Sequence, residues 1–160
     1  MFRSTRTLLL AALIVAPLTA TAATPVFNTP DRKNLAEGAH ALKKGFPGDA
    51  VSNFEQSARY GNKDAQMTLG MMYVRGTGVD MDWARGYAWL ALASTHGKAD
   101  AVSARDQVKA QLKEDELPKA EEWLAKLTEE FGDQAAIERR EQWIRREKRK
   151  LTGSRTGSSA

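Results

Sequence analysis

Apolar positions recur three or four residues apart from about residue 31 to residue 151, which is the period of an amphipathic α-helix. No stretch shows sustained alternation of apolar and polar residues, so strands are not expected. Glycines and polar residues divide the region into segments of about 10 to 18 residues, with breaks at 45–48, 61–62, 76–78, 97, 113–115 and 132–133. The pattern predicts an all-α chain built as a string of helical hairpins.

Acidic residues and glycines stand where the predicted helices should begin and end. A carboxylate can cap the free amides of a first turn, which predicts helix-starting caps at Asp31, Asp49 and Asp133. Glycine adopts the left-handed conformation that commonly ends a helix, which predicts such ends at Gly61, Gly76, Gly97 and Gly132.

Several small or apolar residues recur at a spacing of 36. The matched positions are Gly61 with Gly97, Ala50 with Gly86, Phe54 with Leu90, Ser57 with Ala93, and Ala65 with Ala101. Small residues let helices approach closely, and one hairpin cannot bury its apolar face alone, so neighbouring hairpins must stack. The spacing predicts a short solenoid of three helical pairs over 31–60, 63–96 and 98–131, about the minimum for such arrays.

The stretch 65–97 resembles a Sel1-like repeat, a relative of the tetratricopeptide repeat. The matching residues are Ala65, Leu69, Gly70, Met72, Tyr73, Gly76, Gly78, Val79, Asp82, Ala84, Trp89, Ala93 and Gly97. The segment 37–58 looks like a more tetratricopeptide-like first repeat. Residues 98–127 resemble a terminal pair, although Arg105 and Asp106 replace the expected Leu-Gly. The resemblance implies a Sel1-like repeat domain over 31–131, a right-handed superhelix whose first helices line a concave, partner-binding surface.

That resemblance implies which residues would face a partner. They are Leu35, Ala39 and Lys43 from the first repeat, Met67, Met71 and Arg75 from the second, and Ser103, Gln107 and Gln111 from the third. Met67 and Met71 lie one turn apart, and flexible methionines suit a surface that accommodates a peptide. The alternative interpretation is that both methionines belong to the core.

The segment 132–151 is expected to form a basic amphipathic helix, followed by a flexible tail over 152–160. Ile137, Ile144 and Leu151 are spaced seven apart, with Ala136 and Trp143 beside them. One interpretation is a capping helix whose apolar stripe lies on the last helical pair. The others are a dimer contact, an acidic partner or an anionic lipid surface, and the candidate contact residues are Arg139, Arg140, Trp143 and Arg146.

The N-terminus has the order of segments typical of a secretory signal peptide. Arg3 and Arg6 precede the apolar run 8–15, and small residues follow Pro17. The run is short for a membrane span, which needs about 20 residues, so an uncleaved anchor is the weaker alternative. We expect cleavage after Ala22, an extended lead-in over 23–30 with two prolines, and a periplasmic protein.

The net charge of +4 does not describe the body of the chain. Eight Lys/Arg against four Asp/Glu lie in 133–160, and two arginines lie in the signal segment, which leaves a body with 14 basic and 16 acidic residues. This body lacks the basic footprint of a nucleic-acid-binding domain, so no nucleic-acid partner is expected.

Nothing in the sequence assembles a catalytic or metal site, and no cofactor is expected. The 76–78 segment reads as a turn, because it lacks the glycine and lysine spacing of a phosphate-binding loop. The chain has no cysteine, and His40 and His96 have no metal-ligand spacing; they are expected to be a packed histidine and a helix-end histidine.

The predicted function is a non-catalytic periplasmic scaffold or adaptor that binds an envelope protein or peptide. The alternatives are a cell-wall enzyme or accessory subunit and a membrane-surface protein.

Overall fold

The computed structural model describes residues 29–153, and its helices follow the predicted segments closely. They are α1 (Pro30–Lys43), α2 (Pro47–Ala58), α3 (Lys63–Arg75), α4 (Trp83–Ala93), α5 (Ala99–Lys109), α6 (Leu117–Phe131) and α7 (Asp133–Gly153), with short 3-10 turns η1 (Ser94–His96) and η2 (Glu114–Glu116). No strand occurs in the described range, so the all-α prediction is confirmed. The signal segment 1–22, most of the lead-in and residues 154–160 lie outside it.

None of the three predicted acidic residues is a helix cap. Asp133 is itself the first residue of α7, after Gly132. Helix α1 begins at Pro30 and α2 begins at Pro47, each with proline in its first turn, so Asp31 and Asp49 lie inside the helices. Proline at a helix start needs no amide hydrogen bond and has the helical φ angle already set. The two carboxylates instead face the positive end of the helix dipole.

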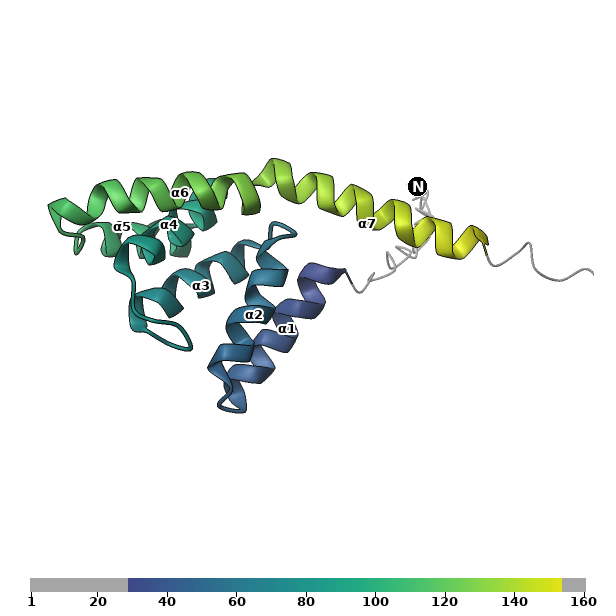
Figure 1. Ribbon diagram of the computed structural model, residues 1–160, viewed down its shortest axis with the longest axis horizontal. Helices are drawn as coiled ribbons and strands as arrows, with labels where there is room; N and C mark the ends of the chain where they lie inside the picture. Colours follow the sequence, from purple (N-terminus) through teal and green to yellow (C-terminus); the bar gives the residue numbers. More distant parts are fainter. Residues whose placement is uncertain (1–28, 154–160) are drawn as a thin grey trace, which may run out of the picture.

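Helices α1 with α2 and α3 with α4 form two close antiparallel hairpins (Figure 1). Their turns differ in length, because 44–46 join the first pair and 76–82 join the second. The longer turn holds Gly76 and Gly78, both at positive φ, and ends at Asp82, whose side chain accepts a hydrogen bond from the amide of Arg85 at 2.9 Å. The first turn is therefore the shorter of the two.

The second hairpin closes where two glycines face each other. A Cβ atom on Gly70 would lie 3.0 Å from the carbonyl oxygen of Gly86, and one on Gly86 would lie 2.6 Å from Cγ2 of Val74. In the first hairpin Gly38 has the same role, because a Cβ there would lie 2.7 Å from the ring of Phe54. Both interhelix contacts therefore depend on the absence of a side chain.

The 36-residue spacing corresponds to equivalent positions in the structure. Phe54 and Leu90 are both buried between helices, at 2% and 0% exposure. The other matched positions in α2 to α5 are also buried. Gly61 and Gly97 both have positive φ, but Gly97 ends η1 whereas Gly61 lies in the turn after α2, which ends at Ala58. Helix positions that match in sequence at this spacing are thus buried in both repeats.

The last two repeat helices depart from this pattern. Helix α6 packs chiefly against α4 and does not lie along α5 as a hairpin partner. In Figure 1 α6 runs across the end of the array, above α4 and α5. Its Leu127 and Phe131 enter the same buried cluster as Trp89 and Leu92 of α4. The solenoid thus ends with a helix that crosses back over the preceding pair.

Helix α7 continues almost in line with α6 along one edge of the molecule (Figure 1). The only residue between them is Gly132, which has φ −67° and ψ 168°. The left-handed end predicted at this glycine is therefore wrong, and the break is extended. A Cβ atom here would lie 2.3 Å from the carbonyl oxygen of Thr128, so the close passage requires glycine.

The glycine contact in the second hairpin gives a stability prediction. We expect Gly86→Ala to lower the free energy of unfolding by about 1–3 kcal/mol, the usual cost of overpacking, because its Cβ meets Val74 and a backbone carbonyl. The matched control is Gly48→Ala in α2, where a Cβ meets nothing within 4 Å. Urea unfolding of both variants should show a loss only for Gly86→Ala, and equal stabilities would contradict the close-contact explanation.

Candidate functional site

The predicted partner-facing residues lie on the first helix of each repeat. Lys43 is on α1, Met67, Met71 and Arg75 are on α3, and Gln107 is on α5. Lys43, Arg75 and Gln107 are exposed. Met67 and Met71 are half-buried.

The two methionines are intermediate in burial. Met67 and Met71 are half-buried, and they stand outside the cluster that holds Leu69, Met72 and Tyr73 of the same helix. Of the other predicted contact residues, Ala39, Ser103 and Gln111 are exposed, whereas Leu35 packs against the core. The two methionines lie one turn apart on α3, so a partly exposed apolar strip runs along this helix.

A cluster of polar and aromatic groups surrounds Arg85, and no sequence pattern indicated it. The Arg85 guanidinium carbon lies 4.3 Å from the ring centre of Tyr73 on α3 and 4.5 Å from that of Trp123 on α6. Its Nε is buried without a hydrogen-bond partner in the described part of the chain. The two rings therefore hold the cation, and it ties α4 to both neighbouring helices.

Beside this cluster lies a cavity of about 350 Å³ bordered by the α3–α4 turn. Its acidic side chains are Asp80 and Asp82, and Tyr73 and Arg85 form the opposite wall. Nearby Glu55 has a raised pKa, because burial outweighs the attraction of Arg85 and Arg59. Burial likewise raises the pKa of the Tyr73 phenol. Among the described residues these groups are not accompanied by a nucleophile with a base at hydrogen-bond distance.

A second polar cluster fixes the start of α7. The Asp133 carboxylate accepts Nζ of Lys63 at 2.9 Å and Nε2 of His96 at 3.0 Å. The Lys63 ammonium also donates to the carbonyl of Leu92 at 3.2 Å. The hydrogen bond from Lys63 to the Asp133 carboxylate is the main reason that the pKa of Asp133 is lowered. His96 thus has a structural partner, whereas His40 is exposed, which corrects the expected packed histidine.

One face of α7 seats the helix on the turn between α2 and α3. Ala136 is 3% exposed, and a Cβ atom on Gly61 would lie 2.9 Å from its methyl group. Arg139 donates to the carbonyls of Arg59 and Glu130. Of the four predicted tail residues, Arg139 is therefore committed to holding the helix in place.

Helix α7 packs on the repeats, but through a different face from the one that the sequence predicted. The stripe predicted to lie on the last pair remains exposed, with Ile137 at 50%, Ile144 at 43% and Leu151 at 77%. The packed face is the neighbouring one, which carries Ala136 and Arg139. Half-buried Trp143 lies on that face too, seven residues after Ala136.

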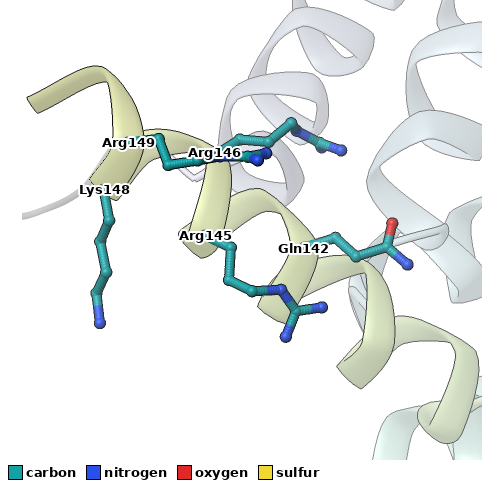
Figure 2. A pocket seen from close by; sticks show the side chains of 5 residues that line it. All are labelled: Gln142, Arg145, Arg146, Lys148 and Arg149. Carbon is teal, nitrogen blue, oxygen red and sulfur yellow. The ribbon is translucent and has the colours of Figure 1, made fainter. Parts of the chain in front are cut away.

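The outer half of α7 carries most of the basic side chains. An open hollow of about 500 Å³ there is bordered by four basic side chains and one amide, those of Arg145, Arg146, Lys148, Arg149 and Gln142. Figure 2 shows them fanning out from the helix, with Arg145 and Lys148 directed away from Arg146. Arg140 lies closer to the body, where it lines a second hollow with Gly61, His96 and Asp133.

Two classes of site are absent from residues 29–153. These residues contain no group of three or more histidine and carboxylate ligands placed to hold a metal ion. They also contain no helix with the length and apolar character that a membrane crossing requires.

Comparisons with known proteins identify the fold. No family model matches the chain. A stretch of 79 residues, 49% of the chain, is 30% identical to the alginate biosynthesis protein AlgK of Azotobacter vinelandii, and the match spans 17% of that protein. The crystal structure of c5321, a protective antigen of uropathogenic Escherichia coli with an SLR fold, superposes with a TM-score of 0.58. At 24% identity, that match covers 69% of this chain and 25% of the other.

The fold and the matched structure define a helical-repeat solenoid. More narrowly, the chain has the Sel1-like repeat fold, so the resemblance read from residues 65–97 is confirmed. Solenoids of this kind present extended surfaces to protein partners. The chain spans only a quarter or less of the two proteins it matches.

The packing around Arg85 predicts that a positive charge without a planar guanidinium would stabilise the fold less at this position. We expect Arg85→Lys to lower the free energy of unfolding by about 1–2 kcal/mol, because an ammonium cannot stack between the rings of Tyr73 and Trp123. The control is Arg32→Lys, at an exposed position of α1. Denaturant unfolding should separate the two variants, and equal stability would show that the stacking contributes nothing.

The Asp133 cluster predicts a pH-dependent contribution to stability. A lowered folded-state pKa means that the contribution is complete above the ordinary value near 3.8 and is lost as the pH falls through the lowered value. Asp133→Asn should therefore reduce stability by roughly 0.5–1 kcal/mol at neutral pH, and the difference from wild type should vanish in acid. Thermal melts from pH 7 to below pH 3 test this. The control is Asp49→Asn, which removes a first-turn carboxylate that has no ion pair among the described residues.

Proposed function

We propose that this chain is a non-catalytic scaffold or adaptor of the cell envelope, which binds an envelope protein or peptide in the periplasm. The observation that carries the proposal is the Sel1-like repeat solenoid, whose α1, α3 and α5 keep accessible side chains at the expected contact positions. Exposed Lys43 and Arg75 would provide charged contacts beside the methionine strip, and Gln107 would provide a polar one.

The match to AlgK supports an envelope role, because that relative is an alginate biosynthesis protein. The residue order of the N-terminus, with its short apolar run and small residues, supports export and cleavage after Ala22. The polar clusters at Arg85 and Asp133 serve packing, which favours binding over chemistry as the role of the described residues.

The methionine strip predicts where a partner docks. We expect Met67→Lys with Met71→Lys to abolish capture of the partner, because two ammonium groups replace the apolar contact area on α3. Both positions are only half-buried, so helicity and melting should change little. The measurement is crosslinking in cells followed by purification of the tagged chain and identification of the captured protein.

The matched control is Ser52→Lys with Gln56→Lys, which adds the same charges at the same spacing on exposed positions of α2. A protein captured by wild type and control, but not by the methionine variant, would place binding on this face. Unfolding of the methionine variant would show that the two residues belong to the core. Sequencing the N-terminus of the exported chain tests cleavage after Ala22.

A further inference from the structure

The exposed stripe on α7 is the largest aligned set of apolar side chains that the fold leaves uncovered. Ile137, Ile144 and Leu151 are 50%, 43% and 77% exposed, and each is seven residues from the next. Seven residues make two helical turns less about 20°, so the three side chains form one line along the helix. Beyond its first turns α7 extends away from the repeats (Figure 1), whereas Ile137 is near the body and lines a hollow with Gly61 and His96.

The charges beside the stripe alternate in sign on both flanks. Arg140 and Glu147 follow apolar positions by three residues and lie on one flank, whereas Glu141 and Lys148 follow them by four and lie on the other. Each flank thus carries one cation and one anion. A docking surface for an acidic protein or an anionic membrane would carry cations on both flanks.

The charges on each flank are complementary to those of a second α7 that runs in the opposite direction. In an antiparallel helix pair related by a two-fold axis, each flank faces the same flank of the other helix in the opposite direction. With Ile144 facing its own copy, Ile137 faces Leu151. Arg140 then lies beside Glu147 of the other helix, and Glu141 beside Lys148, so no like charges are adjacent along either flank.

We propose that α7 pairs with α7 of a second copy of this chain, antiparallel, with the two Ile144 side chains at the two-fold axis. The pairing joins two repeat bodies at opposite ends of one short helix pair. It leaves the face of α7 that holds Ala136 and Arg139 in its intrachain contacts. The ion pairs within α7, Glu141 with Arg145 at 3.3 Å and Glu147 with Lys150 at 2.8 Å, are exposed and weak enough to exchange.

The contact is short, and the pairing should therefore be weak. Two heptads are fewer than the three or four that usually sustain a coiled coil. The helix is anchored at its N-terminal end by Asp133, Ala136 and Arg139, which reduces the ordering cost of pairing. We expect a dissociation constant in the micromolar to millimolar range.

Sedimentation of the chain from micromolar to millimolar concentrations tests association. Wild type should show a concentration-dependent monomer–dimer equilibrium, and Ile144→Glu should remain monomeric because two carboxylates would meet at the axis. Gln142→Glu adds the same charge on the opposite face of α7 and should dimerise like wild type. Arg140→Glu and Glu147→Arg should each weaken the dimer about tenfold, and the double variant should restore it.

Single cysteines test the register, because the chain has no cysteine of its own. Under mild oxidation, Ile144→Cys should give a disulfide-linked dimer. Ile137→Cys is the matched control: in the antiparallel pair its two thiols lie about 21 Å apart along the axis, far beyond disulfide reach of about 7 Å between Cα atoms. Equal crosslinking of both variants, or crosslinking of Ile137→Cys alone, would overturn the proposed register.

Two further results would overturn the proposal as a whole. Wild type that stays monomeric at millimolar concentration would show that the stripe does not bind its own copy. Monomeric protein that binds phosphatidylglycerol vesicles, with binding lost in Ile144→Glu and retained in Gln142→Glu, would assign the stripe to a lipid surface instead.

Discussion

The position of the last third of the molecule depends on how Phe131 is held at the end of α6. Its ring meets that of Trp89 at 65°, with centroids 4.7 Å apart, and both residues are buried. The buried Gln66 amide donates to its carbonyl at 3.0 Å, which satisfies a polar group at a helix end that water cannot reach. Arg59 covers the ring from the other side, 5.3 Å from its centre. Side chains of α3, α4 and the residue that follows α2 thus converge on Phe131.

From this point the path of α7 is nearly determined. Gly132 allows only one residue of extended chain before the next helix begins, so α7 must start over the α2–α3 turn. There Asp133 meets Lys63 and His96, and Arg139 reaches the carbonyl of Arg59. Each contact is modest and partly exposed. Together they join the helix to three different elements near its origin and leave its outer half uncovered.

Much of this fold could be predicted from the sequence, because the repeat encodes burial directly. The equivalence of Phe54 with Leu90, and the close approach at Gly70 and Gly86, follow from residue size and spacing alone. The crossing of α6 over α4 did not follow, because an amphipathic pattern shows that a helix has an apolar face but not which neighbour receives it. The Arg85 cluster escaped prediction for a related reason: its two rings lie 12 and 38 residues away in the sequence and meet only through the fold.

Helix α7 shows where hydrophobic pattern and packing diverge. The apolar stripe of Ile137, Ile144 and Leu151 was the obvious face to bury, yet the structure seats the helix through Ala136 and Arg139. The reason is the space available at Gly61, where a Cβ would already contact the alanine methyl group and a branched side chain would clash. A small residue permits the close approach, and an arginine beside it supplies the hydrogen bonds. Isolated exposed apolar residues are ordinary on protein surfaces, but three in one line on an anchored helix are the feature on which the proposed pairing rests. This line lies on a different element from the methionines of α3, so the proposed pairing and the proposed partner site can be tested by separate substitutions.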